Sequence, residues 1–395
     1  MDFNKTTAIK DGQEASKSGY KVPFGTISIT PLARKLINEA IDHRWLTKGK
    51  YVREFEEKFA GLFGVKFGVA VSSGTDADAI ACAVLYDLGA KRGDEIIVPA
   101  LTFVATGNAV LQAGFTPVFV DVQRETLNID PSKIERAITA RTRAIMPVHL
   151  MGKPAAMDEI MAVARKHKLY VIEDAAEAHG AEYKGKKIGA IGDMACFSLY
   201  AAHIVTTIEG GMIITNNEQM AQAARSLRNH GIEGKFQFKR IGFSAKMNEI
   251  EAAVGLGNIE IFRDILEKRR QNVRYLIKAF AKFDKYFWYL REEKHEVLGP
   301  HAFSIILKPG FNFTKDEFVT FLEKEGIDSR NLFYSIPTQT ASYQFMGHRS
   351  GDFPESEYAS DHGTHIGCHQ DIGLTECAYV IDVVSKFLAS KGHAV

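Results

Sequence analysis

The feature of this sequence that most constrains its fold is the alternation of short apolar runs with amphipathic stretches. Short apolar runs occur at residues 67–71, 95–98, 116–121, 144–148, 169–173 and 211–215. Stretches whose apolar residues recur at helical spacing occur at residues 31–43, 52–63, 76–88, 158–168 and 217–228. Strand-like runs that alternate with helical stretches are typical of a mostly parallel sheet covered by helices. The sequence therefore predicts an α/β fold.

A different pattern follows this alternation toward the C-terminus. Residues 248–283 are rich in helical spacing and predict a connector, and an apolar run at 302–307 with a helical stretch at 314–324 begins a second α/β unit. We expect three parts, which are a polar tail (1–22), a large domain (23–255) and a smaller C-terminal α/β domain (256–395). The boundary near residue 255 falls where one helix can cross it. A chain of 395 residues is long enough for two hydrophobic cores.

The charge balance and the cysteine pattern exclude several classes of protein. The chain has 49 Lys and Arg against 48 Asp and Glu, so it has no basic excess for a nucleic-acid backbone. The N-terminus is polar and no apolar run is long enough to span a membrane, so we expect a cytoplasmic protein that binds neither nucleic acid nor membrane. The four cysteines are scattered and include no Cys-x-x-Cys pair, which indicates reduced, structural thiols.

Two short segments have the chemistry of a site for a phosphorylated ligand. Residues 72–75 (Ser-Ser-Gly-Thr) lie between a predicted strand and a predicted helix, where free N–H groups and the helix dipole suit a phosphate. Taken alone, this turn is more often a plain helix cap. Asp174 ends an apolar run at the carboxyl edge of a predicted parallel strand, where ligands collect in open α/β sheets. Its carboxylate can pair with a protonated ring nitrogen or cap the next turn, and both interpretations stay open.

The combination of motifs is far more specific than either segment. The set comprises Thr-Lys-Gly at 47–49 with Phe-Glu at 55–56, Ser-Ser-Gly-Thr at 72–75, Val-Pro-Ala-Leu-Thr-Phe-Val-Ala-Thr at 98–106, Glu-Asp-Ala-Ala at 173–176, Ser-x-Tyr at 198–200, Glu-Gly-Gly at 209–211 and Asn-His-Gly at 229–231. From about residue 23 to the C-terminus the chain resembles the DegT/DnrJ/EryC1/StrS sugar aminotransferase family. That family consists of fold-type I pyridoxal-phosphate enzymes, so the resemblance implies a large domain with a mostly parallel mixed sheet.

The resemblance also implies which residues bind pyridoxal 5′-phosphate or pyridoxamine 5′-phosphate. It places Gly74, Thr75 and Ser198 at the phosphate, with Ser73 beside them, and Phe103 on the face of the ring. It pairs Asp174 with the pyridine nitrogen. Glu177 stands where most aminotransferases of the family have glutamine or histidine, and it completes this part of the expected cofactor site.

The lysine position of the family is occupied by His203, five residues after Ser198 and six before Glu209. A lysine amine can bind the cofactor covalently and move protons, whereas an imidazole can only move protons. The 3-dehydratases of deoxysugar and lipopolysaccharide O-antigen pathways have this histidine, and the resemblance is closest to their GDP-4-keto-6-deoxymannose branch. Glu177 and the Gly-Cys-His-Gln segment at 367–370 agree with that branch. Residues 231–246 contain no cysteine, which disfavours the iron–sulphur route of CDP-sugar dehydratases.

Two features depart from the family or suggest another site. The family's Gly-Tyr-Asn-x-Arg becomes Gly-Phe-Ser-Ala-Lys at 242–246, so Ser244 replaces an asparagine that reaches the phosphate across a homodimer interface. A shared active site in a homodimer is therefore expected, with the contact of Ser244 open. His362, His365 and His369, with Cys368, have a spacing that can suit a metal. Because the resemblance explains this segment as an active-site rim, we expect no metal.

The sequence thus predicts a lyase that removes the C3 hydroxyl of a nucleotide-linked 4-keto-6-deoxyhexose. His203 is the expected acid and base, since an imidazole with a pKa near about 6.5 can accept and return a proton near neutrality. Glutamate is the expected co-substrate that restores pyridoxamine phosphate. Three alternatives stay open, which are a sugar aminotransferase that tolerates the histidine, a non-catalytic sugar-nucleotide binder, and a histidine introduced by mutation.

Overall fold

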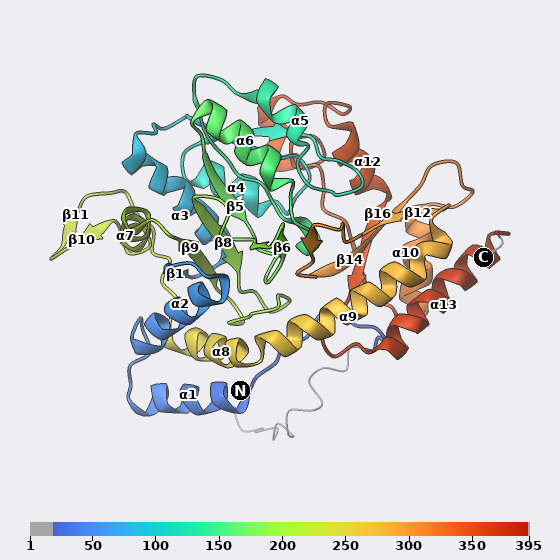
Figure 1. Ribbon diagram of the computed structural model, residues 1–395, viewed down its shortest axis with the longest axis horizontal. Helices are drawn as coiled ribbons and strands as arrows, with labels where there is room; N and C mark the ends of the chain where they lie inside the picture. The colour runs from blue at the N-terminus through green and yellow to red at the C-terminus, as the bar shows by residue number, and fades with distance from the viewer. Residues whose placement is uncertain (1–18, 394–395) are drawn as a thin grey trace, which may run out of the picture.

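A mixed seven-stranded sheet forms the centre of the protein (Figure 1). The computed structural model describes residues 19–393, so residues 1–18 of the predicted tail lie outside the described residues. The strands run in the order β1 (Phe67–Val71), β9 (Gly211–Thr215), β8 (Met194–Ser198), β5 (Tyr170–Asp174), β4 (Thr142–Ile145), β2 (Glu95–Pro99) and β3 (Thr116–Val120). Neighbours from β8 to β3 pair in parallel, whereas β9 is antiparallel to both β8 and β1. The predicted mostly parallel α/β fold is confirmed.

Helices bury both faces of this sheet because strand residues point alternately to the two sides. On β5, Val171 packs in the core beneath α2 (Lys50–Phe63) and α6 (Met157–His167), and Ile172 packs in the opposite core. That opposite core lies under α3 (Gly74–Val84), α4 (Ala105–Gln112) and α7 (Glu218–Leu227). The amphipathic α1 (Pro31–Asp42) packs on α8 (Glu249–Glu260) at the edge of the molecule.

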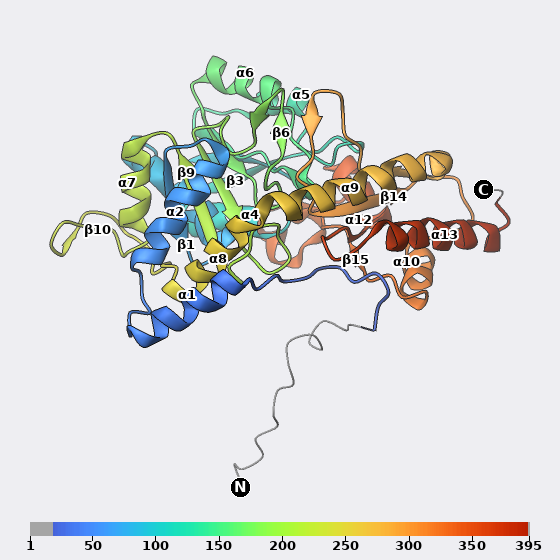
Figure 2. The same cartoon turned by 60° about the horizontal axis from the view of Figure 1, so that its bottom comes forward.

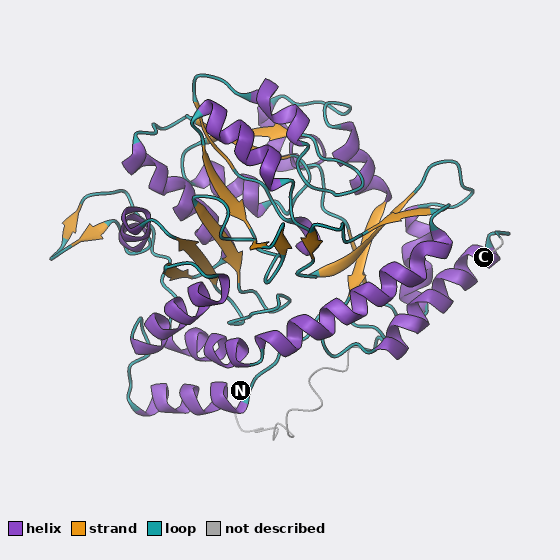
Figure 3. Cartoon of the chain, viewed as in Figure 1, coloured by secondary structure: helices purple, strands orange, loops and turns teal. Residues whose placement is uncertain are grey.

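The C-terminal part has its own core around a second sheet, seen on the right of Figure 3. This antiparallel sheet has the order β12 (Phe287–Tyr289), β14 (Ala302–Leu307), β16 (Gly363–Gly367) and β15 (Ser329–Asn331). The helices that surround it are α9 (Phe262–Phe280), α10 (Lys315–Lys324), α12 (Pro354–His362) and α13 (Leu374–Ser390). The short elements are α5 (Pro131–Ile134), α11 (Ile336–Gln339), β6 (Glu182–Tyr183), β7 (Lys186–Lys187), β10 (Ile232–Glu233), β11 (Gln237–Phe238), β13 (Glu296–Val297) and five 3₁₀ turns at residues 85–88, 135–137, 150–152, 281–283 and 341–346.

Three differences from the sequence-based elements concern the central sheet and the connector. The strand expected at 144–148 begins two residues earlier and ends at Ile145, as β4, and β8 was not predicted, although Met194–Phe197 are apolar and buried. The helical stretch at 248–283 is broken at Ile261, where the backbone leaves helical geometry between α8 and α9. Residue 255 lies inside α8, and the division into two domains stays a prediction.

The segment before α1 links the two sheets. Val22, from the end of the predicted polar tail, is buried and bridges to Ile327 in the C-terminal part. From there the chain runs along the molecule to α1, as Figure 2 shows. It passes over the ends of the central strands on the way, so this segment helps to enclose the space described below.

Two further predictions bear on the chain as a whole. All four cysteines are free and buried, as expected for structural thiols. Across residues 19–393, no helix has the length and hydropathy that a membrane crossing requires. The cytoplasmic location stays a prediction.

Candidate active site

A cavity of about 840 Å³ opens where the carboxyl ends of β5 and β8 meet the first turn of α3. The N-terminal segment at 23–27 and the C-terminal strands β15 and β16 complete its walls. The predicted site residues that line it are Ser73, Gly74, Thr75, Phe103, Asp174, Glu177, Ser198 and His203. Segments far apart in the sequence therefore meet at the strand ends, where ligands bind in open α/β sheets.

One corner of the cavity has the features of a phosphate site. Ser73 caps α3, and its Oγ accepts a hydrogen bond of 3.0 Å from the backbone N–H of Asp76. Gly74 begins the helix directly against Ser198, since a Cβ built on Gly74 would lie 2.7 Å from the Ser198 Cβ. The glycine thus keeps this corner open to the free N–H groups and the positive end of the α3 dipole.

Asp174 lies at the base of the cavity with its carboxylate held in place. Thr106 donates a hydrogen bond of 2.7 Å to Oδ2, and the backbone N–H of Ala176 donates one of 3.2 Å to Oδ1. Burial raises the pKa of this carboxyl, although both hydrogen bonds lower it. A fixed, buried carboxylate is suited to a cationic partner, because such a partner removes the cost of burying its charge.

Three imidazoles gather at the wall that carries His203. Its ring centre lies 4.8 Å from that of His301, and it stacks on His179 at 5.7 Å. Within the described structure, the buried atoms His203 Nδ1, His301 Nδ1 and His179 Nε2 have no hydrogen-bond partner. Burial, followed by the charges of His301, His179 and Arg269, lowers the pKa of His203 well below its ordinary value. His203 is therefore neutral at pH 7 and able to act as a base.

Glu177 is the acidic group of this wall. Its Oε2 accepts a hydrogen bond of 2.7 Å from the backbone N–H of Met151, and its Oε1 lies 3.7 Å from Nε2 of His301. Burial raises the pKa of Glu177 to about 8, with a smaller contribution from the charge of Asp174. Glu177 therefore keeps its proton at neutral pH, and its neighbour His301 stays uncharged because burial lowers the pKa of that imidazole.

The outer part of the cavity is aromatic and carries one arginine. Phe103 is exposed on this side, with its ring 5.6 Å from that of Phe333. The guanidinium of Arg330 lies 5.4 Å from the centre of the Phe24 ring and 3.4 Å from an oxygen of Asp328. Flat apolar rings with a cation at the rim can bind a flat, anionic ligand.

Ser244 lies outside this cavity. It is exposed near β10 and β11, and its backbone bridges to Asn229. The hairpin of β10 and β11 projects from the end of the molecule in Figure 1, with Phe236 (82% exposed) in its turn and Ile241 (85% exposed) just after it. Large apolar side chains exposed in this way are typical of a protein interface. The cross-subunit role of Ser244 stays a prediction.

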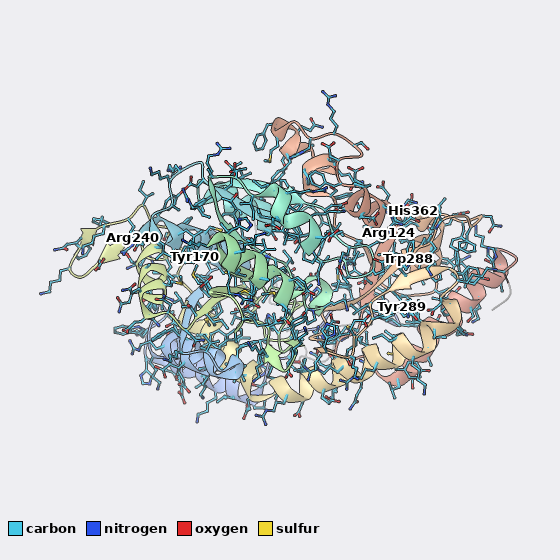
Figure 4. All side chains as sticks on the ribbon, turned by 45° about the horizontal axis from the view of Figure 1, so that its top comes forward. Arg124, Tyr170, Arg240, Trp288, Tyr289 and His362 are labelled. Carbon is cyan, nitrogen blue, oxygen red and sulfur yellow. The ribbon has the colours of Figure 1, made fainter. Side chains whose placement is uncertain are left out.

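His362, His365 and His369, whose spacing can suit a metal, lie apart from one another in the fold. His362 stacks on Tyr358 at 4.0 Å, and the guanidinium of Arg124 lies 4.1 Å from the same ring. Figure 4 shows His362 and Arg124 close to Trp288 and far from Arg240, which is labelled near the β10–β11 hairpin. His365 lines the cavity, whereas Nε2 of His369 bonds to a backbone carbonyl. In the described part of the chain, no three His, Cys, Asp or Glu side chains form a group that could hold a metal.

The sequence did not reveal five residues that line the cavity, namely Phe24, Asp78, Thr106, His301 and Arg330, whereas His365 lies in the segment that the resemblance placed at the active-site rim. Thr106 ends the motif at 98–106 on which the resemblance rests, so its place in the site could have been inferred from the sequence. His301 and Arg330 come from the C-terminal part, more than 95 residues after His203. No local pattern marks them, and only the folded chain places them beside the central sheet.

Comparison with known proteins identifies the family of the chain. The model of the DegT/DnrJ/EryC1/StrS aminotransferase family matches residues 28–385. The chain belongs to this family. The family's characteristic motifs lie at the cavity, because the Ser-Gly-Thr turn, Phe103, Asp174 and His203 all line it.

Relatives of this DegT-family chain carry names from two kinds of reaction. A GDP-perosamine synthase of Caulobacter vibrioides is 41% identical over 311 residues, which cover 77% of this chain and 82% of the relative. A dTDP-4-dehydro-2,6-dideoxy-D-glucose 3-dehydratase of Saccharopolyspora spinosa is 30% identical over 393 residues, covering 90% and 83%. The solved E. coli GDP-4-keto-6-deoxy-D-mannose-3-dehydratase with bound hydrated PLP is 28% identical, with a TM-score of 0.83 over 92% of this chain and 99% of that chain.

Proposed function

We propose that this protein is a pyridoxamine phosphate-dependent 3-dehydratase of a nucleotide-linked 4-keto-6-deoxyhexose. The observation that carries the proposal is the replacement of lysine by His203 in a cavity whose other residues fit the cofactor. None of the described residues that line the cavity is a lysine. The cavity therefore has no amine to bind the cofactor covalently, but it has an imidazole that can move protons.

The residues present fit pyridoxal or pyridoxamine phosphate. Ser73, Gly74, Thr75 and Ser198 form a cradle that a Cβ on Gly74 would fill, and the helix dipole there suits a phosphate. Phe103 offers the face of a ring. The unpartnered buried nitrogens of His203 and His301, which both line the cavity, indicate polar groups that await a ligand. The likeness to the E. coli dehydratase with bound hydrated PLP supports this cofactor.

When bound, pyridoxamine phosphate supplies an amine that joins the substrate ketone and a conjugated ring that accepts electrons. Asp174 keeps the ring nitrogen protonated, because its carboxylate is already fixed by Thr106 and Ala176. His203 would take a proton at the C4′ carbon and return it later, since it starts as a neutral base. The chemistry that the bound cofactor would supply ends in loss of the C3 hydroxyl, and the proton held by His203 would be available for that oxygen to leave as water.

The other residues of the cavity hold the substrate and exclude competing charge. Glu177 stays protonated beside His301 and leaves His203 free of a carboxylate partner. Arg330 is the cation nearest the aromatic rim, and we assign to it the anionic diphosphate of the nucleotide sugar. Glutamate, as the donor that restores the amine of the cofactor, belongs to the same proposal.

A homodimer with a shared active site is part of the proposed function. The exposed apolar side chains on and beside the β10–β11 hairpin support a partner surface there. Ser244 lies next to this hairpin, so a partner subunit bound to it would bring Ser244 toward a second cavity. Sedimentation of the protein, compared with that of an Ile241→Asp variant, tests this part.

A sugar aminotransferase is the second candidate, and the relatives named as GDP-perosamine synthases favour it. Single turnover of the pyridoxamine phosphate form with GDP-, CDP- and dTDP-linked 4-keto sugars separates the two reactions. Ammonia and a 3-deoxy product support the dehydratase, whereas a 4-amino sugar as the main product contradicts it. His203→Asn should lower the rate on the order of 10²–10⁴-fold, the usual contribution of an acid–base group. An unchanged rate in that variant would remove His203 from the mechanism.

A further inference from the structure

A second carboxyl, that of Asp78, lines the cofactor cavity without a role in the proposed mechanism. Asp78 lies one turn into α3 and is 3% exposed. It is one of the residues that form the wall of the cavity. The proposed mechanism uses Asp174 alone for the ring nitrogen, so the presence of another buried acid at the same site needs an explanation.

Asp78 and Asp174 lie on the same side of the central sheet, the side that α3 covers. Asp174 follows Ile172 by two residues on β5, so both point to the face that α3 covers. Cys196, which pairs with Asp174 across β5 and β8, packs on this face and is the side-chain hydrogen-bond donor to Asp78. The two acids are close enough for the charge of Asp174 to raise the pKa of Asp78.

The carboxyl of Asp78 is incompletely satisfied. Its Oδ1 is buried and has no hydrogen-bond partner among the described residues. A buried polar atom without a partner is costly, and most native proteins avoid it. An ionised carboxylate in this place would cost far more, because the thiol of Cys196 is a weak donor and Asp174 carries a like charge. Asp78 is therefore a neutral acid with one oxygen left free.

A purely structural role explains these observations poorly. The neighbours of Asp78 along α3 are apolar and fully buried, as Ile80, Ala81 and Cys82 show. A leucine in place of Asp78 would continue this apolar surface and remove the unsatisfied oxygen. The acid thus weakens the fold at a place where an apolar residue would stabilise it, and such exceptions are typical of functional sites.

We propose that Asp78 is a further cofactor-binding residue, whose free carboxyl oxygen is reserved for the polar edge of the bound pyridine ring. Asp174 supplies the negative charge for the ring nitrogen, and the neutral Asp78 supplies a second polar contact without a second charge. Two acids in one site with different protonation states are an established device for this purpose. The inference rests on the assignment of Asp174 made under Proposed function, and it holds for dehydration and for amine transfer.

The test compares Asp78→Leu, Asp78→Ala and Asp78→Asn with the unmodified protein. Pyridoxamine phosphate is titrated into each cofactor-free protein by calorimetry, and the melting temperature is measured without cofactor. The Leu variant should melt at a higher temperature and bind the cofactor at least about tenfold more weakly, because it gains apolar packing and loses the contact. The Asn variant should bind within about threefold of the unmodified protein, since an amide keeps a donor and an acceptor. If the Leu variant does not fold, the Ala variant tests the contact between Asp78 and the cofactor.

Two controls make the outcome decisive. Cys82→Ala alters the same buried face of α3 one turn further on, outside the cavity, and should leave cofactor affinity unchanged. Asp174→Asn should lower the protonation of a ¹⁵N-labelled ring nitrogen, and an unchanged signal would refute the site assignment itself. If that signal changes while the Leu and Ala variants bind as tightly as the unmodified protein, only the role of Asp78 is refuted. If Asp78→Asn loses as much cofactor affinity as Asp78→Leu, the assignment of Asp78 as a neutral acid is overturned.

Discussion

The raised pKa of Glu177 has a direct consequence for the stability of the cofactor-free protein. In the folded chain this carboxyl keeps its proton until about pH 8, whereas its ordinary value is 4.5. The folded state therefore binds one more proton than the unfolded state between these values. Linkage requires that the free energy of unfolding falls as the pH rises through this window, because the unfolded state gains the ionised form first. The contribution of the protonated Glu177 to the free energy of unfolding is fully present below pH 4.5, the ordinary pKa, and is lost as the pH rises through about 8.

The size of this effect follows from one proton. Between pH 6.5 and 8.5 a group with these two pKa values lowers the free energy of unfolding by about 2 kcal/mol. Glu177→Gln keeps the shape of the side chain and an oxygen for the N–H of Met151, but it does not titrate. The decline over this range should therefore be smaller in the Gln variant than in the unmodified protein by about 2 kcal/mol.

Urea unfolding of the two cofactor-free proteins at pH 6.5, 7.5 and 8.5, followed by circular dichroism, measures this difference. Buried cysteines also favour the protonated folded state at the upper end, but they are common to both proteins and cancel in the comparison. Equal denaturant slopes at each pH show that the compared unfolding reactions expose the same surface. The same pH dependence in both proteins would show that Glu177 is ionised in the folded state, and would refute the reasoning from its burial.

Three other predictions follow from single contacts. Gly74→Ala should weaken the binding of pyridoxamine phosphate at least about tenfold, because the new Cβ meets Ser198. Gly61→Ala is the control, since a Cβ at Gly61 has open space and should leave the affinity unchanged. Equal affinities of the two variants by calorimetry would contradict the prediction. In cofactor-free protein the imidazole signal that disappears in His203→Asn should titrate below pH 6.5, and an NMR midpoint at or above that value would show that burial does not control this group. Glu249, buried on α8, accepts N–H bonds from Gly49, Tyr51 and Val52 at the start of α2. Its change to Gln should cost about 2 kcal/mol in urea unfolding, against little for the exposed Glu54→Gln, and a cost equal to that of the control would refute the role of this cap.

The sequence by itself determined the class of the fold and the place of the site along the chain. Apolar runs and helical spacing are local properties, so they identified β1, β2, β3, β5 and β9 and most of the helices that cover them. The motif turns lie at the ends of these strands, and their order along the chain sufficed to identify the family. The replacement of the family's lysine by His203 is visible in the sequence alone.

Only the tertiary structure decided what surrounds that histidine. His301 packs on it and Glu177 lies against His301, each from a separate segment, and burial rather than residue type sets the protonation of all three groups. Asp78 appeared in the sequence as one polar residue in a helix, and its position against the sheet makes it a buried acid of the cavity. Local patterns report which residues are apolar and how they repeat. The pKa and the partners of a polar group depend on contacts between distant segments, which form only when the chain folds.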